Sequence, residues 1–174
     1  SFLDEAQAVA VGEIGMDLYW DKTFLKQQQE AFHLQIEWAK KRRLPIVIHC
    51  RDAFDAVFEV LESHKGPLLR GIFHCFTGDL SQANRAISLG MKLGIGGVLT
   101  FKNGGLDRFI DQIDLSHLVL ETDAPYLAPV PYRGKRNTSA YLPLVAEKLA
   151  FLTGKSIEDI AAITTENSRA VFGV

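Results

Sequence analysis

The sequence predicts an α/β fold, a TIM (β/α)8 barrel with about five of the eight βα units present in this chain. Short apolar runs alternate with stretches of helical periodicity along the whole sequence. Glu13, His49, His74 and Asp123 close four of these runs. Side chains from four strand ends surround one site only where the strands converge on a barrel mouth. A complete barrel takes about 250 residues and this chain has 174, so about three strands are expected to be missing on the amino-terminal side.

The expected elements follow one another in βα pairs. Each helix is inferred from apolar positions that recur about once per turn, and Asp52 and Gly90 are expected to cap and to end two of them. Strands are expected over residues 8–13, 46–49, 71–74, 92–96 and 118–121. Helices are expected over residues 24–39, 54–61, 80–89, 106–113, 141–152 and 157–172.

Composition predicts one domain over residues 1–174, because 47% of the residues are hydrophobic, 23% are charged and no linker interrupts the pattern. A net charge of −2 gives no general attraction for nucleic acid. The longest apolar stretches are far shorter than the roughly 20 residues that cross a bilayer, and no signal pattern opens the chain. We therefore expect a cytoplasmic protein without a membrane partner, in which Cys50 and Cys75 are reduced thiols.

The residues that close the apolar runs predict a metal site. The runs read AVAVGE, LPIVIH, GIFHCF and LVLETD. Glu, His and Asp bind Zn²⁺, Mn²⁺ and Mg²⁺ with overlapping preference, so the identity of the metal stays open. One buried residue of this kind is usually a satisfied structural group. Four of them would each need a separate partner if no metal were bound.

Five segments resemble the TatD family of metal-dependent deoxyribonucleases, within the amidohydrolase-like metal hydrolases. They are GEIGMDLYW, IVIHCRDA, FHCFTG, GIGGVLTFK and ETDAPYLAPVPYRGKRN, and the resemblance covers residues 9–174. Two departures stand out. The family's amino-terminal His-x-His strand is absent, since no histidine precedes His33, and Ser139 stands where the family usually has proline.

The resemblance implies a barrel of the metal-dependent hydrolase type that uses two divalent ions, Mg²⁺, Zn²⁺ or Mn²⁺. Glu13 would bridge the ions, His49 and His74 would bind one of them, and Asp123 would bind the other. The absent His-x-His pair would complete the coordination shell of the second ion. Two cations about 3.5–4 Å apart clamp a phosphoryl group and lower the pKa of bound water to near 7. Glu13 and Asp123 are the expected catalytic residues, with Asp123 as general base.

Basic residues near the expected barrel mouth are candidate DNA contacts. Arg51 could bind a phosphate, or pair with a neighbouring aspartate instead. The basic residues after the last strand could bind DNA or attach their loop to the barrel, while Tyr19 and Trp20 could stack on a base or pack on the rim. No GxGxxG or Walker sequence is present, so a nucleotide cofactor is not expected. The expected substrate-binding residues are Arg51, Lys102, Arg133, Lys135 and Arg136.

These observations predict a deoxyribonuclease that cleaves phosphodiester bonds, most simply as an exonuclease. One alternative keeps the metals and makes the substrate a small cyclic amide or ester. Another is an inactive truncated barrel that binds metal or nucleic acid. Open sheet edges and an exposed apolar interior would then favour self-association.

Overall fold

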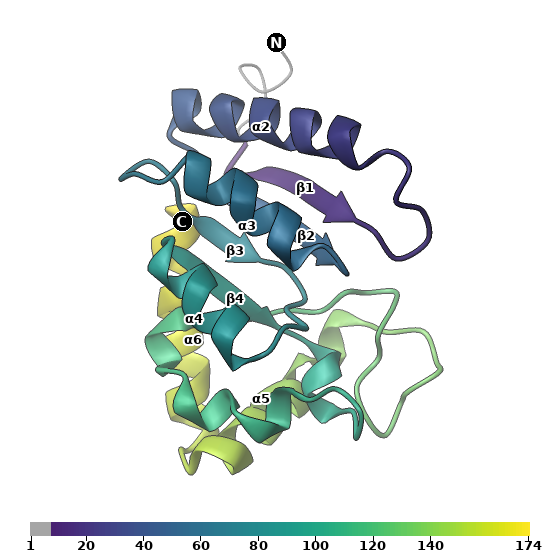
Figure 1. Cartoon of the computed structure of the whole chain (residues 1–174). Coiled ribbons are helices and arrows are strands. Elements are labelled where there is room, and N and C mark those ends of the chain that lie inside the picture. The colour runs from purple at the N-terminus through teal and green to yellow at the C-terminus, as the bar shows by residue number, and fades with distance from the viewer. Residues whose placement is uncertain (1–7) are drawn as a thin grey trace.

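The computed structural model describes residues 8–174, and its centre is a five-stranded parallel sheet (Figure 1). Each strand pairs with the next one in the sequence, in the order β1-β2-β3-β4-β5. A doubly wound sheet reverses its strand order part-way, whereas this order runs in one direction, as it does in a barrel. The strands are β1 (Val11–Asp17), β2 (Ile46–Arg51), β3 (Gly71–Phe73), β4 (Met91–Ile95) and β5 (Leu118–Leu120).

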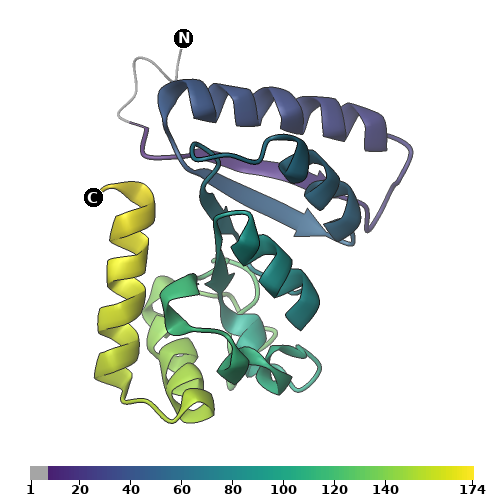
Figure 2. The same cartoon turned by 60° about the vertical axis from the view of Figure 1, so that its left-hand side comes forward.

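Helices cover both faces of this sheet. The three that connect the first four strands, α2, α3 and α4, lie on one face (Figure 1), while α6 lies on the other side of β3 and β4 (Figure 2). None of the helices within residues 8–174 is long and apolar enough to cross a membrane. The helices are α2 (Leu25–Arg42), α3 (Phe54–Ser63), α4 (Leu80–Ser88), α5 (Leu142–Thr153) and α6 (Ile157–Phe172).

The main core lies between the sheet and the helices α2, α3 and α4. Alternate strand residues such as Ile48, Phe73 and Leu93 are fully buried there. Phe58 of α3 lies with its ring centroid 5.6 Å from that of Phe73 and anchors the helix on β3. The next residue along each strand points to the opposite face, which in a barrel is the interior.

The carboxyl-terminal end of α6 covers this second face of the sheet near the beginnings of the strands. Val171 joins Ile72 and Val119 in a small buried cluster, against which Val47 and Phe172 pack. The interior apolar side chains of β2, β3 and β5 are therefore covered near the strand starts by the chain's own last helix. The polar side chains near the strand ends stay outside this cluster.

The bounds of the first strand and the capping residue of α3 differ from the expectation. The first strand runs over Val11–Asp17 rather than 8–13, so Glu13 lies near its beginning and Asp17 at its end. Asp52 does not cap α3: Ala53 is the N-cap residue, without a side-chain hydrogen bond. The backbone of Asp52 is left-handed, with φ at 52°, whereas a capping residue normally has an extended conformation.

The helix expected over residues 106–113 is instead two 3-10 turns, η2 (Leu106–Arg108) and η3 (Ile110–Gln112). Phe109 separates them with φ at −148°, which is outside the helical region. Leu106, Ile110 and Ile113 are nevertheless all buried. Their spacing indicates one buried face, and two short turns present that face as well as an α-helix does.

Candidate metal centre

A bulge in β1 places two carboxylates on the interior face. Val11 pairs with Ile46 and Ile14 with Ile48, so β1 uses three residues where β2 uses two. Beyond the bulge Ile14 is buried under the helices, and Glu13 and Asp17 alternate with it on the open face. β1 therefore brings Glu13 and Asp17 to the same side as His49 of β2.

His49 lies between these two carboxylates. Its Nδ1 is 3.0 Å from Glu13 Oε1, and its Nε2 is 3.0 Å from Asp17 Oδ2. Sequence reasoning anticipated Glu13 and missed Asp17. The spacing Glu13-x-Gly15-x-Asp17 was the available signal, because residues two apart on a strand share a face.

His74 connects the remaining residues. Its Nε2 lies 3.9 Å from Glu13 Oε1 and 3.5 Å from Asp123 Oδ1. Its Nδ1 donates to Glu121 Oε2 at 2.8 Å, while Glu121 Oε1 accepts the Cys75 N–H at 2.6 Å. The structure thus brings together all four of the predicted metal ligands, with Glu13 near both histidines.

Glu121 is the second residue that sequence reasoning missed. Its carboxylate reaches His74 beneath Gly94, where an added Cβ would lie 2.6 Å from Glu121 Oε2. A carboxylate that accepts the Nδ1 proton of a histidine fixes the ring and leaves Nε2 to face an ion. The alternation Glu121-x-Asp123 was the signal in the sequence.

The charges of the site favour a cation. The hydrogen bond that His74 donates to Glu121 raises the pKa of His74 to about 9; burial opposes the shift, and the charges of Glu121, Glu13 and Asp123 support it. Burial acts to raise the pKa of Asp17, but hydrogen bonds from the Tyr19 N–H and His49 lower it on balance. A protonated His74 thus carries positive charge at the position where the carboxylates converge.

The donor set fits a divalent ion by its chemistry, with imidazole nitrogens and carboxylates from separate strands. Within residues 8–174, no group of three or more His, Cys, Asp or Glu side chains is arranged to hold an ion as it stands. The rings and carboxylates instead pair directly with one another. Binding would therefore exchange these pairs for contacts with the ion.

The two cysteines beside the histidines are not part of the donor set. Both are free, as the sequence predicted, and burial raises the pKa of each thiol to about 12. A cysteine binds metal as the thiolate. Cys50 and Cys75 therefore remain neutral packing residues beside the site.

The predicted substrate-binding residues are spread around the loops that follow the strands. The guanidinium of Arg51 lies over the Tyr19 ring, 3.7 Å from its centroid, and its charge contributes to lowering the pKa of Asp17. Arg133 lies over Phe101 at 4.3 Å and so connects the long last loop to the loop after β4. The other three, Lys102, Lys135 and Arg136, are exposed.

Asn137 fixes the conformation of the proline-rich loop that follows β5, residues 124–132. This residue is 4% exposed, its N–H donates to Pro125 O, and its Nδ2 donates to Tyr126 O. Arg136 beside it lines an open pocket of about 380 Å³ together with Ala124, Thr138 and Ser139. The asparagine is therefore structural, and it fixes the chain segment that carries Arg136.

The whole chain matches a known family. The sequence model described as TatD related DNase matches residues 1–173. The chain belongs to this family. TatD-related proteins of known sequence include the metal-dependent hydrolase YabD of Bacillus subtilis, which is 41% identical over 97% of this chain. The 3'-5' ssDNA/RNA exonuclease TatD of Salmonella typhimurium is 34% identical over 98% of it.

A solved TatD structure has the same fold. YJJV, a TatD homologue from Escherichia coli K12, superimposes with a TM-score of 0.91 at 34% identity and covers 97% of this chain. The chain spans 66% of the length of YabD and 65% of YJJV. The parallel α/β architecture expected from the sequence is confirmed by this match, and the TatD relationship inferred from the motifs is correct.

Proposed function

We propose that this chain carries the metal centre of a nuclease that hydrolyses phosphodiester bonds in DNA. The observation that carries the proposal is the convergence of Glu13, His49, His74 and Asp123 on one side of the sheet, with Glu13 Oε1 near both histidines. In the proposed site Glu13 would be shared by two divalent ions, His49 and His74 would hold one of them, and Asp123 would hold the other. The name of the Salmonella relative, a single-stranded DNA and RNA exonuclease, supports an exonuclease acting on nucleic acid.

The protein's own residues would perform the remaining tasks. Bound divalent ions polarise a phosphoryl oxygen and lower the pKa of a coordinated water. The carboxylate of Asp123, which is 34% exposed, can accept a proton from an attacking water. Glu121 keeps His74 oriented, and the exposed Lys102, Lys135 and Arg136 can neutralise phosphates of the substrate.

We further propose that the sheet represents five of the eight βα units of a barrel. Its strands follow one another in order and in parallel, and α2, α3 and α4 all cover the outer face. In that arrangement donors from other strands, such as a His-x-His pair, complete the shell of the second ion. A domain that includes residues 1–174 would then have its catalytic mouth at the ends of these strands.

Incubating the protein with Mn²⁺ and end-labelled single-stranded DNA tests the proposed activity. We expect stepwise shortening of the DNA, its loss on addition of EDTA, and at least about a 100-fold reduction in Asp123→Asn, because a general base contributes roughly 10²–10⁴-fold. Asp111→Asn, a change at an exposed carboxylate in η3, is the matched control and should behave as wild type. Turnover of small cyclic amides or esters with intact DNA would overturn the proposal.

A calorimetric titration separates the nuclease from an inactive metal-binding barrel. We expect Mn²⁺ or Zn²⁺ to bind the wild-type chain and to bind Glu13→Gln much more weakly, since Glu13 lies near both histidines. Binding of metal without any cleavage of DNA would favour the inactive barrel. No binding at all would contradict the metal assignment itself.

A further inference from the structure

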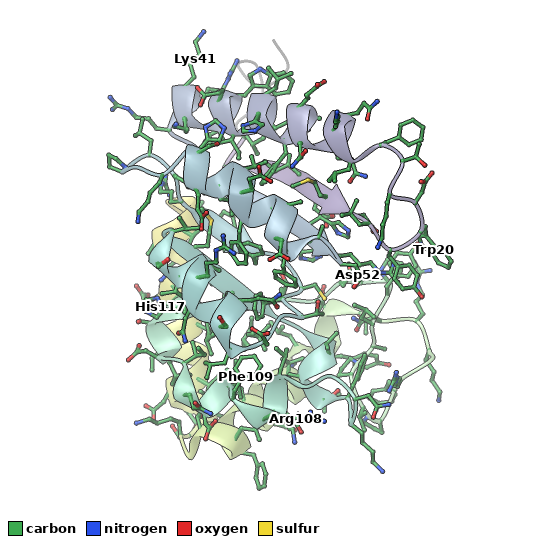
Figure 3. The ribbon with its side chains drawn as sticks, viewed as in Figure 1. Trp20, Lys41, Asp52, Arg108, Phe109 and His117 are labelled. Carbon is green, nitrogen blue, oxygen red and sulfur yellow. The ribbon has the colours of Figure 1, made fainter. Side chains whose placement is uncertain are left out.

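The loop between β1 and α2 exposes two aromatic rings beside the metal centre. Trp20 is 83% exposed and Tyr19 is 49% exposed. Figure 3 shows the labelled Trp20 at the outer edge of the molecule, on the side where the arrows of β1 and β2 end. Large apolar rings left in water at a functional edge are typical of a binding surface.

The two rings and one arginine form a preorganised group. The Tyr19 and Trp20 rings meet edge to face with centroids 4.6 Å apart. The Arg51 guanidinium lies over the Tyr19 ring at 3.7 Å. Because the rings already contact one another, a ligand that binds them would lose little side-chain freedom on binding.

Backbone contacts tie this group to the metal centre. The Tyr19 N–H donates to Asp17 Oδ1 at 2.9 Å, and Asp17 Oδ2 lies 3.0 Å from His49 Nε2. The Leu18 N–H donates to Arg51 O at 2.9 Å, which joins the ends of the two strands. A ligand on these rings would therefore lie at the edge of the metal centre.

We infer that Tyr19, Trp20 and Arg51 form a stacking platform for an unpaired base of a single-stranded nucleic acid. The inference rests on the proposed nuclease function. It assigns the preference of that nuclease for single-stranded nucleic acid to these three residues. Every base has a flat face that can stack on an aromatic ring, but a base inside a duplex is already stacked and paired. Arg51 adds the positive charge that a phosphate needs near this group of carboxylates.

Binding measurements on the whole chain test the platform. The chain has two tryptophans, so Trp38→Phe leaves Trp20 as the only tryptophan. With Mg²⁺ and a hydrolysis-resistant phosphorothioate oligonucleotide, we expect the single strand to quench this fluorescence and the matching duplex to leave it nearly unchanged. By anisotropy, Trp20→Ala should bind the single strand at least about 5-fold more weakly, the lower end of the effect of one base stack.

Phe151→Ala is the matched control. Phe151 is 80% exposed on α5 with Lys148 near its ring, so it offers a similar exposed aromatic away from the metal centre. We expect this variant to bind as wild type and Trp20→Phe to recover part of the lost affinity, with unchanged circular dichroism in all variants. The platform would be overturned if Trp20→Ala and Phe151→Ala bound the single strand equally well. Equal affinity of the wild type for single strand and duplex, or no binding of any oligonucleotide, would overturn it as well.

The platform and the nuclease fail in different ways. Metal-dependent cleavage of DNA with unchanged affinity in Trp20→Ala would overturn the platform and leave the nuclease intact. Selective binding of single strands through Trp20 without any cleavage would support the platform and overturn the proposed nuclease.

Discussion

Glu121 shows how a single side chain can orient a proposed metal ligand, His74. It touches both His74 Nδ1 and the Cys75 N–H, so it sets the orientation of the ring and of the backbone beside it. Its side chain is 13% exposed, which makes both hydrogen bonds difficult for water to replace. A carboxylate in this position supports the histidine rather than the ion.

Replacing Glu121 with Gln should weaken metal binding about 10- to 100-fold, the usual effect of losing such a supporting partner. The amide is neutral and has one accepting oxygen, so it cannot accept from both His74 Nδ1 and the Cys75 N–H as the carboxylate does. Titration calorimetry with Mn²⁺ measures the change. Glu166→Gln, at an exposed carboxylate paired with Arg169, is the control and should bind as wild type. Equal affinities in both variants would contradict the supporting role.

His74 should make the metal-free protein less stable as the pH rises. Its pKa in the folded state is about 9, against about 6.5 in an unfolded chain. The folded state therefore binds the proton more tightly, so this contribution is complete below pH 6.5 and is lost as the pH rises through 9. At about 1.4 kcal/mol per pKa unit, the contribution is at most roughly 3.5 kcal/mol.

Urea unfolding in EDTA at pH 6.5 and pH 8.5 measures this contribution. The free energy of unfolding should fall over this interval in wild type and stay nearly level in His74→Gln. Burial raises the pKa of the Cys50 and Cys75 thiols, and both proteins contain them, so their contribution cancels in the comparison. An equal fall of the free energy of unfolding in the two proteins would exclude the predicted protonation of His74.

At the scale of elements, the close pairing of β1 and β2 positions half of the metal centre. Gly15 pairs with His49 across the two strands. It has φ at +130°, and an added Cβ would lie 2.1 Å from His49 O. No side chain fits at this point without separating the strands or changing the backbone, and either change would move His49 relative to Glu13.

Gly15→Ala should therefore cost about 2 kcal/mol or more of the free energy of unfolding, from backbone strain and the clash together. It should also weaken metal binding, because the same displacement moves His49. Denaturant unfolding and calorimetry measure the two effects. Gly66→Ala, where the new Cβ would meet nothing within 4 Å, should change stability by less than about 0.5 kcal/mol.

At the scale of the whole molecule, α6 covers part of the sheet face opposite α2, α3 and α4 and so limits how much of that face is exposed. Asn167 Nδ2 donates to Leu115 O and to Leu118 O, both at 2.7 Å, which attaches the helix to the start of β5. Val171 then covers Ile72 and Val119. Within the described residues, β1 and β5 each pair with one strand only. Self-association through these edges stays a prediction. Val171 of α6 already covers part of the apolar face that such association would bury.

Val171→Asp should expose this face. Placing a carboxylate against Ile72 and Val119 removes apolar contacts and brings a charge into the cluster, which we expect to cost about 3 kcal/mol even with Arg70 bound to the Val171 carbonyl. We expect reduced stability in urea and increased self-association in sedimentation experiments. Ala170→Asp introduces the same charge one residue away at an exposed position and should change neither property appreciably. Equal behaviour of the two variants would show that α6 does not protect the interior.

Much of the architecture was predictable from local patterns. Alternating periodicities indicated the five strands in order, and the polar residues that close apolar runs indicated Glu13, His49, His74 and Asp123. The errors fell where local pattern is ambiguous. The bulge in β1 extends the first strand to Asp17, and the buried face of residues 106–113 is presented by two 3-10 turns.

The amino-acid pattern determined the parallel α/β architecture and the TatD relationship and predicted the four donor residues, because each is carried by short segments of the chain. The pairing of those donors arose only in three dimensions. Glu121 lies 47 residues from His74, and Asp17 lies 32 residues from His49. Such contacts depend on strand register, on a bulge and on glycines that allow backbones to approach, and local sequence does not specify how these features combine in space.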